Sequence, residues 1–179
     1  MEIVVSDTQI LIDMDVAGLL EMVAVSSVHF HTVDYVIAEL HRSPYERPIV
    51  DRMVEEGHLA VFSFEGKEAS DLFSYYGKFA SKSNLTITDC AVLKYAKDNN
   101  YRMLTGDRKL RNHAEDEGVM VSGILYLADH FVKEGLLTGS EMASRLEHLL
   151  DINPRLPKAI FKDWIKRVRV GNNGTSPST

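Results

Sequence analysis

Short apolar runs rich in β-branched residues recur along the chain, separated by longer stretches in which apolar residues repeat at a spacing of three and four. The short runs predict strands near residues 3–6, 25–30, 58–61, 102–105 and 119–121. The longer stretches predict helices near residues 8–24, 33–40, 47–56, 65–80, 87–99, 108–118, 122–134 and 139–150. Because strands that alternate with helices build βαβ units, the pattern predicts an α/β fold: a parallel-sheet α/β/α sandwich with helices on both faces.

The C-terminal region has a different pattern. Two Xaa-Pro pairs within residues 151–157 predict an extended or turned segment. Residues 158–170 then carry an apolar stripe at helical spacing, made of Ile160, Phe161, Trp164, Ile165 and Val168. Such a stripe predicts a helix that packs on its own domain or across a homodimer. We therefore expect a main domain over residues 1–150, an extension over 151–170 and a disordered Gly/Asn/Ser/Pro-rich tail over 171–179.

Composition narrows the class of protein. The single cysteine, Cys90, excludes an internal disulfide and suits a small buried side chain in a reduced compartment. No stretch approaches the roughly 18 apolar residues that span a membrane, and the N-terminus lacks the basic start of a signal peptide, so we expect a cytoplasmic protein without membrane contacts. The net charge of −6 argues against broad coating of nucleic acid by Lys and Arg.

Four acids lie where predicted strands end or on the helices beside them: Asp7, Glu39, Asp89 and Asp107. Ligand sites of parallel sheets form beyond the carboxyl ends of the strands. Carboxylates gathered there would suit a hard divalent cation such as Mg²⁺ or Mn²⁺, which indicates a metal-dependent nuclease. The structural alternative is helix capping by Asp7, Asp89 and Asp107, with Glu39 on an exposed helix face.

The order of these acids resembles that of the PIN-domain nucleases, in particular the toxin-type, VapC-like members of prokaryotes. That family has an Asp-Thr pair after the first strand, a Glu on the second helix, an Asp on a later helix and a Thr/Ser-x-Asp after the following strand. The corresponding segments here are Val4-Val5-Ser6-Asp7-Thr8, Val36-Ile37-Ala38-Glu39-Leu40, Thr86-Ile87-Thr88-Asp89-Cys90-Ala91 and Leu104-Thr105-Gly106-Asp107. The resemblance covers about residues 1–135.

The resemblance implies a ribonuclease that hydrolyses phosphodiester bonds of RNA with Mg²⁺ or Mn²⁺. Asp7, Asp89 and Asp107 are then the expected direct or water-mediated ligands. Glu39 is expected to orient a metal-bound water or to ligate a second ion. Some relatives carry a further acid just beyond the last Asp, where this chain has Arg108, so only one metal site is clearly indicated.

Neighbouring side chains have expected supporting roles. The short hydroxyls of Thr8 and Thr105 suit hydrogen bonds that hold the carboxylates in place. Arg108, Lys109 and Arg111 follow Asp107 and could contact RNA phosphates, although a solvated helix face explains them somewhat better. A zinc site is not indicated, because the histidines form no HExxH or Cys/His pattern.

Other functions and partners stay open at this stage. The resemblance implies RNA as substrate and, for a toxin-type member, a protein antitoxin. The alternatives are a catalytically idle protein of the same fold and a receiver-like signalling module, which Asp51 disfavours because it lies in a polar helix rather than after a strand. The basic residues of the last helix, Lys162, Lys166, Arg167 and Arg169, could instead form an RNA-contacting arm.

Overall fold

The computed structural model describes residues 2–42, 48–79 and 84–171, so the predicted disordered tail lies, after Gly171, outside the described residues. Within this part of the chain, five parallel strands form one sheet in the order β3-β2-β1-β4-β5. Their bounds are β1 Glu2–Ser6, β2 Val28–Val33, β3 Leu59–Phe62, β4 Arg102–Leu104 and β5 Val121–Ser122. The predicted α/β fold with a parallel sheet is therefore confirmed.

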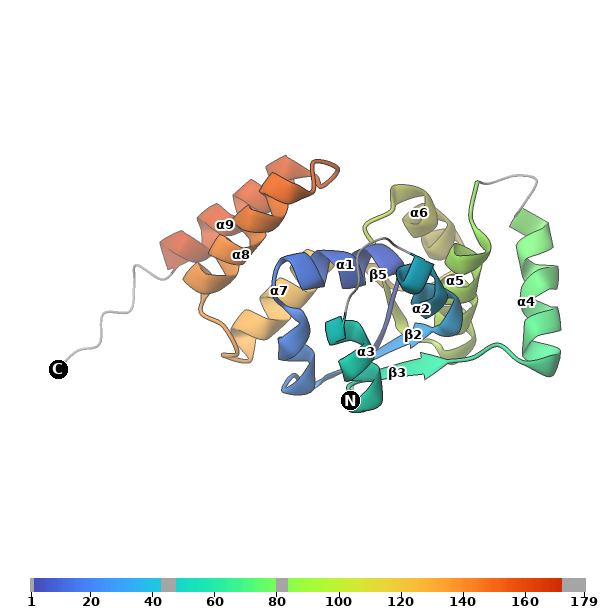
Figure 1. The fold of residues 1–179 in the computed structure, drawn as a ribbon. Coiled ribbons are helices and arrows are strands. Elements are labelled where there is room, and N and C mark those ends of the chain that lie inside the picture. The colour runs from blue at the N-terminus through green and yellow to red at the C-terminus, as the bar shows by residue number, and fades with distance from the viewer. Residues whose placement is uncertain (1, 43–47, 80–83, 172–179) are drawn as a thin grey trace.

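Helices connect the strands and cover both faces of the sheet (Figure 1). The helix α5 packs on β1, β2 and β4, whereas α1 packs on α7 and α8. In chain order the helices are α1 Thr8–Val16, the 3₁₀ helix η1 Leu20–Ala24, α2 Asp34–Arg42, α3 Pro48–Glu55, α4 Gly66–Phe79, α5 Ile87–Asn99, α6 Arg108–Asp116, α7 Ile124–Lys133, α8 Gly139–Ile152 and α9 Lys158–Gly171. None of the described helices is long and apolar enough to cross a membrane.

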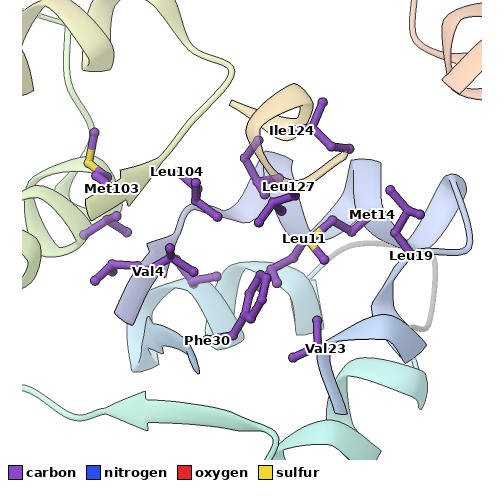
Figure 2. Close-up of a cluster of buried hydrophobic side chains, with 14 of the residues drawn as sticks. Val4, Leu11, Met14, Leu19, Val23, Phe30, Met103, Leu104, Ile124 and Leu127 are labelled. Atoms are coloured by element: carbon purple, nitrogen blue, oxygen red, sulfur yellow. The ribbon is translucent and has the colours of Figure 1, made fainter. Parts of the chain in front are cut away.

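The central strand β1 is the anchor of the hydrophobic core. Val4 and Val5 are fully buried and point to opposite faces of the sheet, as the period of two in a strand requires. Figure 2 shows Val4 and Phe30 beside Leu11 and Leu127, so side chains of α1 and α7 fill one face. The helix α5 also packs on β1, and α1 begins two residues after β1 ends.

Two predicted boundaries are wrong, and backbone geometry explains both. The helix predicted over residues 8–24 divides into α1 and η1, because Gly18 has a φ of 64°, which does not continue a right-handed helix. The strand predicted over 25–30 is β2, Val28–Val33, which is set by its pairing of Glu2 with Val28 and Val4 with Phe30. Register across the sheet, rather than the local apolar run, decides where this strand begins.

The C-terminal extension folds back on its own chain. The helix α9 packs along α8 (Figure 1), and Phe161, Trp164 and Ile165 are buried. The indole Nε1 of Trp164 donates a hydrogen bond of 2.8 Å to Asp129 on α7. The helix therefore packs on its own chain, one of the two predicted alternatives, but Ile160 of the predicted stripe is 60% exposed.

Replacing Trp164 with phenylalanine is expected to lower the free energy of unfolding by about 1–2 kcal/mol, because the hydrogen bond to Asp129 is lost while most of the packing is kept. Urea denaturation followed by far-ultraviolet circular dichroism measures this, since Trp164 is the only tryptophan in the chain. Asp129→Asn, which keeps an acceptor, is the control and should change stability less. Equal losses in the two variants would mean that the charge of Asp129, which also lies 3.7 Å from the guanidinium of Arg167, is what stabilises the helix.

Candidate active site at the carboxyl edge of the sheet

Buried hydroxyls hold the carboxyl end of β1 in place. Ser6, Thr32 and Thr105 are fully buried where β1, β2 and β4 end. The Thr32 hydroxyl donates to the carbonyl of Ser6 at 2.9 Å, and the backbone N–H of Asp7 donates to the carbonyl of Leu104 at 3.1 Å. These bonds join three strands at the position where Asp7 leaves the sheet, so the direction of its side chain is fixed by the fold.

The four acids singled out in the sequence line one cleft. The cleft has a volume of about 310 Å³, and Asp7, Glu39, Asp89 and Asp107 all contribute to its wall. Asp7 is buried, Asp89 is half-buried, and Glu39 and Asp107 are exposed. Residues that are 100 positions apart in the sequence, Asp7 and Asp107, thus meet because β1 and β4 are neighbours in the sheet.

Three of these acids also cap helices. Asp7 accepts a hydrogen bond of 2.8 Å from the backbone N–H of Ile10, and Asp107 accepts one of 2.8 Å from that of Leu110. Asp89 completes a capping box at the start of α5. Capping and a place in the cleft are therefore compatible: the cap fixes one oxygen of each carboxylate at a helix N-terminus.

The hydroxyls of Thr8 and Thr105 form hydrogen bonds with acidic residues of the cleft. Thr8 donates to Oε2 of Glu39 at 2.6 Å, which links the start of α1 to α2. The hydroxyl of Thr105 accepts a 3.0 Å hydrogen bond from the backbone N–H of Asp107, and its side chain also hydrogen-bonds to Asp7. Both threonines thus lie where a supporting role would need them, and that role stays a prediction.

Burial and mutual repulsion make the cleft unfavourable for negative charge. Burial raises the pKa of Asp7 to about 7, against hydrogen bonds from Thr105 and Ile10 that lower it, and the nearby charge of Asp89 raises it further. Burial also raises the pKa of Asp89, with smaller contributions from the carboxylates of Asp107 and Glu39. A cation in the cleft would relieve this repulsion and keep the carboxylates ionised.

The acids fit a hard divalent cation in chemical type and charge. Among residues 2–42, 48–79 and 84–171, however, no group of three or more His, Cys, Asp or Glu side chains has the arrangement of a metal-binding cage. The hydrogen bonds to Ile10, Leu110 and Thr8 each involve one oxygen of a carboxylate, so the second oxygen of Asp7, Asp107 and Glu39 is not used by these bonds.

The predicted RNA-contacting residues divide into two kinds. Arg108 and Lys109 are exposed at the start of α6, beside the cleft. Arg111 is half-buried and donates to the carbonyls of Thr105 at 3.2 Å and Val121 at 3.3 Å. Arg111 thus joins the ends of β4 and β5, and its guanidinium already has structural partners; RNA contact by all three stays a prediction.

The sequence analysis missed one charged group next to the cleft. Asp13 on α1 is only 2% exposed, and its Oδ1 accepts hydrogen bonds from Gln9 at 2.8 Å and from Asn153 at 2.9 Å. The sequence held a signal for this side chain. Asp13 lies between Ile12 and Met14 in an apolar segment and follows Gln9 by four residues, a spacing at which two side chains on a helix can contact each other. Of the histidines, His31 hydrogen-bonds to Tyr95 and His41 to Asp51.

Comparisons with known proteins identify the family of this chain. A family model described as PIN domain matches residues 3–170, and the chain belongs to this family. Two solved structures are similar. One, a PilT N-terminus domain protein of the archaeon Sulfolobus solfataricus P2, has a TM-score of 0.49 and 18% identity, with 83% of this chain and 96% of that chain covered.

The second similar structure is that of VapBC2 from Rickettsia felis bound to a DNA fragment from its promoter. It has a TM-score of 0.46 and 16% identity, and the match covers 68% of this chain and 98% of that chain. No curated protein matches the chain. Family membership therefore rests on the sequence model, which excludes the receiver-like module as the fold.

Proposed function

We propose that this PIN-domain protein is a metal-dependent ribonuclease that uses Mg²⁺ or Mn²⁺. The observation that carries the proposal is the single cleft lined by Asp7, Glu39, Asp89 and Asp107, at the edge where β1 and β4 end. Membership of the PIN-domain family supports a nuclease. An idle protein of the same fold would have no need for a buried carboxylate next to three others, because each addition costs electrostatic free energy.

Asp7, Asp89 and Asp107 would hold the ion. Asp7 is the most buried of the three and is fixed by Thr105 and Ile10, so it would set the position of the ion relative to the sheet. A bound divalent cation lowers the pKa of a coordinated water and stabilises charge on the attacking and leaving oxygens of a phosphodiester. These side chains would hold the ion in position, and none of them would form a covalent bond with the RNA.

Glu39, on α2, would act on a water molecule in the same cleft. Its carboxylate is exposed and is oriented by the hydroxyl of Thr8, so it can accept a proton from water or orient a water molecule. Arg108 and Lys109 at the start of α6 would attract the RNA phosphates that the net charge of −6 otherwise repels. A cytoplasmic location, a protein antitoxin and a homodimer stay predictions.

Removing divalent metal is expected to abolish cleavage of single-stranded RNA by the purified chain. The assay compares EDTA, Mg²⁺, Mn²⁺ and Ca²⁺ on a fluorescent RNA that also contains a structured hairpin, with products resolved on a denaturing gel. Activity should return with Mg²⁺ or Mn²⁺, because both ions activate water while bound to oxygen ligands. Cleavage that persists in EDTA after exhaustive dialysis would identify a contaminant or a different mechanism, and no cleavage with any ion would favour the idle protein.

A further inference from the structure

A second, larger pocket lies beside the acidic cleft. It has a volume of about 630 Å³ and shares Gln9 and Asp107 with that cleft. Its walls come from α1, the start of α6, the start of α7 and the connection between α8 and α9. The C-terminal extension therefore completes a cavity that opens next to the proposed site of cleavage.

Asp13, one of the residues that line this pocket, has a carboxylate oxygen without a partner among the described residues. Oδ1 of Asp13 accepts hydrogen bonds from Gln9 and Asn153, but Oδ2 is buried and accepts none from the described part of the chain. Burial raises the pKa of Asp13, against the two hydrogen bonds that lower it. A buried carboxylate oxygen that lacks a donor costs free energy, and a ligand that brings an N–H group would supply the missing bond.

The rest of the pocket combines an apolar wall with positive charge. Leu125, Leu156, Ile160 and Phe161 supply apolar surface, and Ile160 is exposed although it belongs to the apolar stripe of α9. Arg108 and Arg155 are exposed among the lining residues. Within the described part of the chain, neither arginine forms an ion pair through its side chain. A flat apolar group attached to an anion suits these surroundings.

We propose that this pocket binds the nucleobase adjacent to the phosphate in the acidic cleft, and that Oδ2 of Asp13 accepts a hydrogen bond from an exocyclic amino group of that base. The inference rests on the proposed function for its substrate class, RNA. The arginines favour an anionic polymer over a basic protein side chain, and the shared lining residues Gln9 and Asp107 make the two cavities neighbours. Adenine, cytosine and guanine carry such an amino group, whereas uracil does not, so the pocket selects against uracil.

The test measures binding rather than cleavage. Fluorescence anisotropy of labelled single-stranded RNA tetranucleotides of adenylate, cytidylate or uridylate is recorded with the full chain in EDTA, so that no metal-dependent step enters. We expect the adenylate and cytidylate probes to bind about tenfold more tightly than the uridylate probe, the value of one good hydrogen bond. The same preference without any cleavage activity would leave the pocket inference standing while the proposed function fails.

Asp13→Asn is the decisive variant. Oδ1 must stay an oxygen to accept from Gln9 and Asn153, so the new amide nitrogen takes the place of Oδ2 and becomes a donor. The preference should then invert toward uracil, whose carbonyl accepts. A merely structural role of Asp13 would weaken binding of all three probes alike and would not invert their order.

Arg155→Gln keeps the inference testable even if Asp13→Asn folds poorly, because Arg155 is exposed. It should weaken binding of all three tetranucleotides about threefold or more and reduce the salt dependence of binding. The matched control, Arg52→Gln on α3, lies outside the pocket and should leave binding unchanged. Equal affinity of the parent for all three probes would overturn the inference. It would also be overturned if the parent bound N-acetyl-arginine amide, a mimic of a basic protein side chain, and none of the RNA probes.

Discussion

Asp7→Asn is expected to lower metal-dependent RNA cleavage by more than a hundredfold while the fold is retained. Changing a group that only supports a metal ligand typically costs about 10- to 100-fold in activity or affinity, so removing the charge of a central ligand should cost more. The asparagine side chain has nearly the same shape, and its oxygen can still accept the hydrogen bond from the N–H of Ile10. The loss would therefore be chemical rather than structural.

The control is Asp116→Asn, which makes the same change of charge on the exposed end of α6, outside the cleft. Both variants are compared with the parent under matched Mg²⁺ in an initial-rate assay, and circular dichroism checks that the fold is kept. If the Asp7 variant cuts RNA as fast as the parent, the acidic cleft is not the active site.

In the absence of metal, Asp7 is expected to lower the free energy of unfolding as the pH rises. The pKa of Asp7 is raised from 3.8 to about 7 in the folded chain, so the folded state binds a proton that the unfolded state has lost between these values. The free energy of unfolding contributed by Asp7 should therefore fall between about pH 4 and pH 7. Three pKa units correspond to about 4 kcal/mol.

Urea denaturation in EDTA at pH 4.5 and pH 8 measures this effect, with Asp7→Asn as the reference that cannot titrate at this position. Burial also raises the pKa values of Asp13 and Asp89, so the difference between parent and variant isolates Asp7. At pH 8 the variant should be the more stable protein, and saturating Mg²⁺ should reduce its advantage. Parallel pH curves for the two proteins would mean that Asp7 titrates normally.

The sequence predicted the succession of strands and helices because each element has its own local periodicity. It also placed the four acids, since Asp7 and Asp107 directly follow strands that the apolar pattern marks clearly. Boundaries were less accurate where a single backbone angle or pairing with a distant strand decides them, as at Gly18 and at the start of β2. Local patterns carry no information on such register.

Asp13 illustrates what the sequence could not provide. Its second amide partner, Asn153, is 140 residues away and reaches it only because α8 packs on α1 and ends beside it. In the same way, the exposure of Ile160 depends on the pocket between α9 and the sheet edge, not on the helical stripe to which it belongs. Both features arise from tertiary packing between segments that share no local pattern.

The central position of β1 also has a consequence for synthesis of the chain. β1 is made first, yet its neighbour β4 ends at Leu104, and the last acid of the cleft is Asp107. Because a chain emerges from the ribosome N-terminus first, a product that stops before residue 89 contains Asp7 and Glu39 but neither Asp89 nor Asp107. A stalled or prematurely terminated translation product of that length therefore cannot assemble the acidic cleft, which needs the chain to be made at least as far as Asp107.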